Sequence, residues 1–406
     1  MTDLDLTVGE TGPGTVETLS GDHVAALLGV PGVVRLTPVA GGRWRVSGNG
    51  KVGLVRLRTP SGAAIRLHLR PKITVRDLLF LLCYAPTDPW LPEPVTAAGA
   101  DDLLPALADL FARTARRTLE AGVLHGYRTV EEDLPLVRGR IRAADQLRRV
   151  GLPLPVAVRY DDHTADIAEN RVLLGALLLA AGLPGVHDPT RRALRHLCGH
   201  LTGVRPPRPG EAPPLWTSNR LNSRYVPALR LAELILSGQS VQPTGPESAR
   251  VDGFLLDMPA VYERFVESAL GAALARHRVR CAAQERHHRL DEAGRVGFRP
   301  DLVLYRAGRP VSVVDAKYVF LRTAAPHVEH LYQLLGYCTA LGLSHGHLVY
   351  AASRHGPSDH VIRRTGITVT AHALDLGRPP ATLLADVATL ADRMAAGAVS
   401  PGTVEQ

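Results

Sequence analysis

The stretch from Arg299 to Lys317 constrains the fold most, because it has the pattern of a β-hairpin with charged residues at its open end. Two apolar runs, 302–305 and 311–314, flank a short link that contains glycine and proline. Links of this kind join antiparallel strands. The sequence therefore predicts a hairpin centred on Gly308.

The hairpin brings three charged side chains to one place. A turn centred on Gly308 puts Asp301 opposite Asp315, with Cβ atoms about 4.5–5.5 Å apart. Lys317 lies on the same strand face as Asp315, because side chains alternate along a strand. Two neighbouring carboxylates repel each other, and a hard divalent ion that takes oxygen ligands from both relieves the repulsion. We therefore predict a Mg²⁺ site, with Mn²⁺ as the alternative ion, and a lysine beside it that suits phosphodiester hydrolysis.

A surface hairpin with solvated charges is the alternative interpretation. The second strand argues against it, since Val311, Val313 and Val314 leave almost no polar position before Asp315. A strand of this composition is typical of one covered on both faces.

Further elements are predicted on both sides of the hairpin: a helix over 259–277, a helix over 327–341 and a strand over 347–351. With Asp301, Asp315 and Lys317, this order resembles the PD-(D/E)xK nuclease superfamily. The resemblance implies a mixed α/β fold with an αβββαβ core, and a catalytic and metal-binding role for Glu263 of the first helix. A solvated helix face is the alternative for Glu263. Gln333 of the second helix is a further candidate catalytic residue.

The rest of the chain divides into two regions of different pattern. Residues 1–90 contain short alternating runs between Gly, Pro and Asn turns and predict a small β-rich domain. Residues 91–245 are mainly helical, with a mixed-charge loop over 127–141 that passes into a helix near Ala143. The nuclease-like domain then covers 246–406. A Pro-rich link over 85–89 marks the first boundary.

Charge and composition restrict the function classes. The chain has 406 residues, a net charge of +8 and 45% hydrophobic residues, which suits a folded protein with an anionic partner. No apolar stretch approaches a membrane span of about 18 residues, and no signal-peptide pattern opens the sequence, so a cytoplasmic location is expected. Arginines crowd one part of the middle region, and Arg138, Arg140 and Arg142 are candidate DNA-binding residues. An ordinary solvated helix face is the alternative.

Two other patterns are weaker. The run 47–51 looks like a phosphate-binding loop but lacks its first glycine and the Ser or Thr after its lysine, so no nucleotide site is predicted. His287 and His288 are adjacent, and on a strand they would point to opposite faces.

Several segments taken in order resemble the McrC family over most of the chain. They are 70–73, 130–141, 169–173, 225–231, 262–266, Pro300-Asp301, 315–317 and 333–341. The resemblance implies the nuclease subunit of a modification-dependent restriction system that acts on methylcytosine-containing DNA. It also implies a McrB-like AAA+ GTPase hexamer as partner, entered by the N-terminal β-rich part of the subunit.

A basic, glycine-flanked hairpin over 38–51 is the candidate for that contact, through Arg43, Trp44 and Arg45. A core role is the alternative for Trp44. Two other functions stay open: a non-catalytic adaptor that activates an AAA+ partner, and a free-standing DNase.

Overall fold

The computed structural model describes residues 3–84, 103–148, 154–208, 211–238, 252–320, 326–351 and 356–397. The predicted domain boundaries after residues 90 and 245, and the link over 85–89, lie outside these ranges. Residues 1–101 and 241–406 together form one compact unit, and residues 102–240 form another.

The first part of the larger unit is β-rich, as the sequence predicts. It contains a four-stranded sheet and a three-stranded sheet, in the orders β1-β6-β5-β10 and β2-β4-β3. Their elements are β1 (Leu4–Gly9), β2 (Thr15–Glu17), α1 (Gly21–Leu28), β3 (Val34–Val39), β4 (Arg43–Gly48), β5 (Lys51–Arg58), β6 (Ala64–Arg70) and β10 (Asp252–Asp257). Both sheets contribute to one buried apolar core, in which Val46, Val55 and Leu67 are fully enclosed.

Strand β10 belongs to the C-terminal part of the sequence but pairs antiparallel with β5. Two glycines permit this pairing: a Cβ atom on Gly53 would lie 2.0 Å from the Phe254 carbonyl oxygen, and one on Gly253 would lie 2.6 Å from that of Leu54. The prediction of separate N-terminal and nuclease-like domains is therefore corrected, because a shared sheet joins the two.

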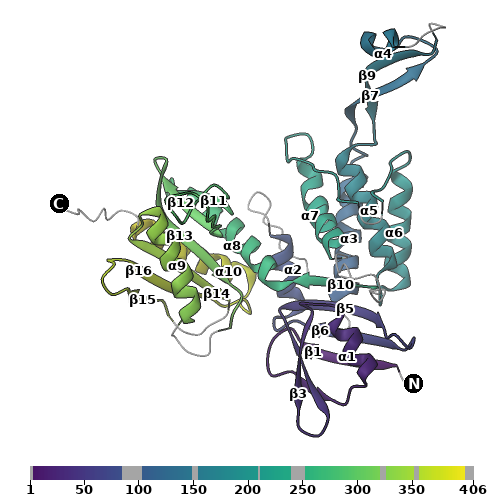
Figure 1. The fold of residues 1–406 in the computed structure, drawn as a ribbon. Coiled ribbons are helices and arrows are strands. Elements are labelled where there is room, and N and C mark those ends of the chain that lie inside the picture. Colours follow the sequence, from purple (N-terminus) through teal and green to yellow (C-terminus); the bar gives the residue numbers. More distant parts are fainter. Residues whose placement is uncertain are drawn as a thin grey trace. The chain divides into compact units, whose positions relative to one another are not determined.

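The C-terminal sheet has six strands in the order β11-β12-β13-β14-β16-β15. Its strands and helices are α8 (Met258–Ala275), β11 (Arg280–Ala283), β12 (Leu302–Arg306), β13 (Arg309–Lys317), α9 (Val328–Leu341), β14 (His345–Ala351), β15 (Ser358–Val361), β16 (Thr368–Leu374) and α10 (Pro380–Gly397). Helix α9 covers β13, β14 and β16 on one face, whereas α8 and α10 pack against each other (Figure 1). The predicted order of helix, strand, hairpin, helix and strand is present.

Side-chain contacts also connect the two parts of this unit. The Tyr318 hydroxyl, next to Lys317 at the end of β13, donates to Glu10 Oε1 at 2.9 Å. Helix α2 (Val75–Cys83) packs on α8, with the rings of Phe80 and Phe265 5.9 Å apart. The end of β13 is thus held by the N-terminal sheet.

The smaller unit combines a helical bundle with a β arm. Its elements are α3 (Leu103–Glu120), β7 (Gly126–Leu134), β8 (Arg140–Ile141), α4 (Ala143–Leu147), β9 (Val156–Thr164), α5 (Ala168–Gly182), α6 (Asp188–His200), a 3-10 turn (Ser223–Tyr225) and α7 (Val226–Ser237). Figure 1 shows β7, β9 and α4 extending beyond the ends of the helices. The prediction of a loop over 127–141 was wrong, since most of this segment pairs with β9.

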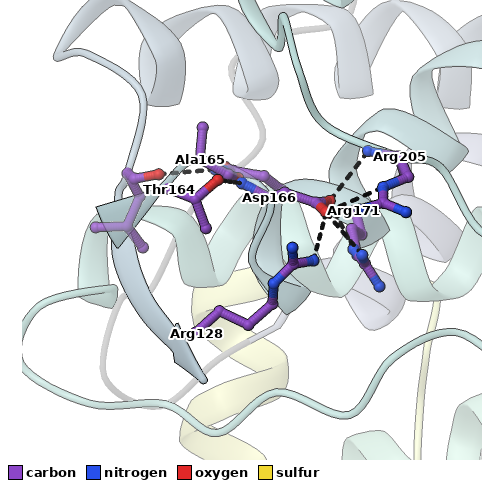
Figure 2. A network of polar contacts seen from close by, with 8 residues as sticks. Arg128, Thr164, Ala165, Asp166, Arg171 and Arg205 are labelled. Carbon is purple, nitrogen blue, oxygen red and sulfur yellow. Dashed lines mark hydrogen bonds and ion pairs between the residues drawn. The ribbon is translucent and has the colours of Figure 1, made fainter. Parts of the chain in front are cut away.

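One buried carboxylate holds the arm to the bundle (Figure 2). Asp166 follows β9 and is only 4% exposed. Its oxygens lie 2.7 Å from Arg128 of β7 and 2.7 Å from two nitrogens of Arg171 of α5, and Oδ1 accepts the backbone N–H of Arg205 at 3.0 Å. Charged hydrogen bonds from Arg171, with the neighbouring arginines, hold the pKa of Asp166 well below its ordinary value.

None of the helices in the described part of the chain is long and apolar enough to cross a membrane.

Candidate active site

The β12–β13 hairpin brings Asp301 and Asp315 together, as the sequence predicts. Leu302 pairs with Val314, so that Asp301, just before β12, falls opposite Asp315. Asp301 Oδ2 accepts the backbone N–H of Ala316 at 2.8 Å. The two carboxyl groups are close enough to share a hydrogen bond.

The residues around Asp315 are buried, which excludes a solvated surface hairpin. Strand β13 is buried from Ser312 to Ala316, and β14 pairs with it on the side away from β12. Asp315 is 1% exposed. Lys317 Nζ lies 2.7 Å from Asp315 Oδ2, with the lysine side chain four-fifths buried.

Helix α8 places Glu263 beside this pair. Burial, followed by the negative charge of Asp301, raises the pKa of Glu263 to about 7. Glu267, one turn later, also has a raised pKa, through burial and a smaller effect of Asp301. The charges of Asp315 and Lys317 also shift the pKa of Glu263, but not that of Glu267. Glu263 is therefore the more central of the two in the cluster.

Helix α9 contributes the other side chains near the cluster. Gln333 Nε2 donates to the Tyr337 hydroxyl at 2.7 Å, and that hydroxyl donates to the Arg299 carbonyl at 3.5 Å. Gln333 is therefore connected through Tyr337 to the backbone that leads into Asp301.

His330 is a member of this group that the sequence analysis missed. Its Nδ1 lies 2.9 Å from the Tyr350 hydroxyl, and burial together with the positive charge of Lys317 lowers its pKa to about 4. The imidazole is neutral at pH 7. The three-residue spacing from Gln333, which places both on one helix face, was the signal that could have found it.

Burial and mutual repulsion dominate the electrostatics of the carboxylates. Burial, then the charge of Asp301, raises the pKa of Asp315 to about 6. The pKa of Asp301 is also raised by burial, although the Ala316 N–H and Lys317 oppose the rise. Asp315 Oδ2 is buried and has the Lys317 ion pair but no hydrogen bond of regular geometry. An oxygen-only donor set with such an atom fits a hard divalent cation.

These pKa values predict a steep pH dependence of metal binding. Mg²⁺ needs deprotonated ligands, so we expect its affinity to rise between about pH 5 and about pH 8 as Asp315 and Glu263 lose their protons. The sign for stability is opposite: because both folded pKa values exceed the unfolded ones, the metal-free protein is stabilised at low pH and loses that contribution as pH rises through about 6 to 7.

Calorimetric Mg²⁺ titration and thermal melting across this range measure both effects. Glu263→Gln should remove the upper part of the pH dependence and leave the part due to Asp315. Equal Mg²⁺ affinity at about pH 5 and about pH 8 would contradict the prediction that Asp315 and Glu263 bind the ion.

The arginines predicted to bind DNA lie on the β arm, and two of them are paired with carboxylates. Arg138 contacts Asp162 at 2.7 Å and stacks over Tyr160, and Arg142 pairs with acidic groups of the arm. Arg140 is exposed. Their role in DNA binding stays a prediction.

The predicted partner-contact residues lie on β4. Arg43 and Arg45 are exposed, whereas Trp44 is half-buried and packs against the core of the N-terminal sheets. This packing favours the core role for Trp44 and leaves the two arginines as the accessible groups.

The chain matches a protein family and resembles solved structures. The profile described as "McrBC 5-methylcytosine restriction system component" matches residues 48–351. A chain in the refined half-complex from a tetradecameric assembly of Thermococcus gammatolerans McrB AAA+ hexamers with bound McrC has 17% identity and a TM-score of 0.54. That match covers 96% of this chain and 100% of the other.

A chain in the cryo-EM structure of the Thermococcus gammatolerans McrBC complex gives 19% identity and a TM-score of 0.38, over 64% of this chain and 73% of that one. No curated protein matches the sequence. Since the family match spans most of the chain, this protein belongs to the family of McrBC 5-methylcytosine restriction system components.

Proposed function

We propose that this chain is a McrC-like, Mg²⁺-dependent DNA endonuclease, the nuclease subunit of a modification-dependent restriction complex. The observation that carries the proposal is the convergence of Asp301, Asp315 and Lys317 at the buried end of the β12–β13 hairpin. The order of α8, β11, β12, β13, α9 and β14 supports a PD-(D/E)xK core.

The residues divide into metal-binding and phosphate-facing groups. Asp301, Asp315 and Glu263 would hold Mg²⁺, which when bound would polarise a phosphate oxygen and lower the pKa of a water. Lys317 orients the attacking water and offsets the negative charge that develops at phosphorus. Its contact with Asp315 holds the ammonium group beside the carboxylate pair.

Helix α9 places neutral side chains near the lysine and beside the backbone that leads into Asp301. Neutral His330 adds no second positive charge beside Lys317, and Gln333 with Tyr337 fixes the backbone before Asp301. Gln333 and Tyr337 thereby help to position the Asp301 carboxylate.

The adaptor alternative is disfavoured by the cost of the carboxylate cluster. Burying like charges destabilises the folded chain, and a protein that only activates a partner gains nothing from Asp301 and Asp315 side by side. Catalysis through a bound cation would explain why the chain keeps a destabilising pair of buried carboxylates.

The proposed partner is a McrB-like AAA+ GTPase hexamer, and the proposed substrate is double-stranded DNA with methylated cytosine. The likeness to a chain from an assembly of McrB hexamers with bound McrC supports this partner. Arg43 and Arg45 are the proposed contacts with it, and Arg138, Arg140 and Arg142 are the proposed contacts with DNA.

We expect the purified chain to cleave DNA weakly and to gain activity with its cognate AAA+ GTPase. The test compares cleavage of methylated and unmethylated duplexes by the chain alone, by the partner alone and by both, with GTP and Mg²⁺. Vigorous Mg²⁺-dependent cleavage of unmethylated DNA by the chain alone would favour a free-standing DNase. Stimulated GTP hydrolysis without cleavage would favour the adaptor.

A further inference from the structure

A second group of metal-ligating side chains lies outside the carboxylate cluster, in the segment that follows β11. Glu285, His287 and His288 each offer one ligand atom, and these atoms all lie within 4.8 Å of one another. The expectation that the two histidines point to opposite faces of a strand was wrong, because residues 284–288 are outside any strand. The imidazole rings lie side by side, with centroids 4.1 Å apart.

The spacing of these atoms suits a small transition-metal ion. His288 Nε2 and Glu285 Oε2 are 3.1 Å apart. In tetrahedral Zn²⁺ sites with bonds of 2.0–2.2 Å, neighbouring ligand atoms lie about 3.4 Å apart. One ion can therefore replace the hydrogen bond between His288 and Glu285 with only a small movement of either side chain.

Surrounding residues already orient two of the three ligands. The Tyr305 hydroxyl donates to Glu285 Oε2 at 2.6 Å, and outer contacts of this kind fix ligating carboxylates. His288 is 8% exposed and stacks on Phe298, with centroids 5.5 Å apart. His287 is exposed, which leaves solvent access for a water ligand.

We propose that Glu285, His287 and His288 bind one Zn²⁺ ion, with a water as fourth ligand. Two imidazoles and one carboxylate are a donor set that zinc prefers, whereas the Asp301–Asp315 cluster offers only oxygen to a hard ion. The two sites therefore differ in metal preference as well as in position.

The site has a structural consequence for the hairpin that carries Asp301. The N–H of Gln284, next to Glu285, donates to the Asp301 carbonyl at 3.0 Å. Phe298, which stacks on His288, also stacks on Tyr337 at 5.2 Å between centroids. Zinc held by the 285–288 segment braces the loop from 284 to 300 and the backbone that leads into Asp301.

The test measures Zn²⁺ stoichiometry and affinity on the chelator-treated full chain, with Co²⁺ absorption as a probe of nitrogen ligation. Asp315→Asn should retain one equivalent of Zn²⁺. His287→Ala should lose it, and because His287 is exposed this change leaves the core intact. Tyr305→Phe should weaken binding about tenfold.

The matched control is His196→Ala, since His196 and His200 form another imidazole pair one turn apart on α6, with centroids 5.2 Å apart. Retained Zn²⁺ in this variant and loss in His287→Ala supports the proposal. Zn²⁺ loss that follows His196→Ala or Asp315→Asn, or unchanged Zn²⁺ binding in His287→Ala, would overturn it. The readout does not depend on nuclease activity.

Discussion

Asp315→Asn is expected to reduce DNA cleavage by the partner-activated chain by roughly 10²–10³-fold or more, since it removes one of the proposed metal ligands and the ion-pair partner of Lys317. Single-turnover cleavage at saturating Mg²⁺ measures the effect. The amide occupies the same volume as the carboxylate, so the hairpin keeps its shape.

Two controls separate this loss from a loss of folding or of partner binding. Asp359→Asn changes an exposed carboxylate on edge strand β15 of the same sheet and should leave cleavage unchanged. Stimulation of the partner's GTP hydrolysis should also persist in Asp315→Asn. Cleavage by this variant at the wild-type rate would rule out the metal-binding role.

The same substitution should stabilise the metal-free protein at about pH 8. A carboxylate with a pKa near 6 is charged there at a cost of about 3 kcal/mol relative to an ordinary aspartate. Removing the charge removes the repulsion from Asp301. A higher melting temperature with lost cleavage would show that the cluster exists for chemistry rather than for stability.

Asp166→Ala is expected to destabilise the smaller unit by about 3 kcal/mol, because it leaves Arg128 and Arg171 without their shared buried partner. Urea unfolding of the full chain, with amide hydrogen exchange of β7 and β9 as a local probe, measures the loss. Exchange should accelerate most where the arm joins the bundle.

Asp162→Ala is the matched control for this change. Asp162 pairs with Arg138 on the arm, where half of the arginine side chain is exposed, and exposed pairs contribute less than about 1 kcal/mol. If the two variants unfold at the same urea concentration, burial of Asp166 does not determine how much its ion pairs contribute to the free energy of unfolding. Because the folded pKa of Asp166 is lowered, its stabilisation is present at neutral pH and disappears only in strong acid.

The site hairpin could be predicted because its determinants are local. Strand composition and a single glycine fix the register near Asp301, and the observed pairing of Leu302 with Val314 agrees with a centre at Gly308. The turn itself differs. Ala307 and Gly308 both have positive φ and form a two-residue turn, and an irregularity after Leu304 restores the predicted register at the carboxylates.

Other elements could not be predicted, because they either pair with a strand that is remote in the sequence or have no apolar face that marks them as strands. Residues of β7 are mostly exposed or half-exposed on both faces, so the strand lacks the apolar alternation that indicates a sheet. Strand β10 is short, and its partner β5 is remote in the sequence. The positions of Glu263 and His330 relative to Lys317 depend on helix packing across the sheet, which single-sequence periodicity does not specify.

The pairing of β5 with β10 also sets an order of events during synthesis. Strand β5 ends at Arg58 and β10 begins at Asp252, so the ribosome adds about 190 residues between them. At 5–20 residues per second this takes roughly 10–40 s. During that time the edge of β5 has no native partner, while the whole of the 102–240 unit emerges and can fold. Until Asp252–Asp257 arrives, the N–H and C=O groups along this edge of β5 lack their native partners, and an unpaired strand edge of this kind can pair with another chain.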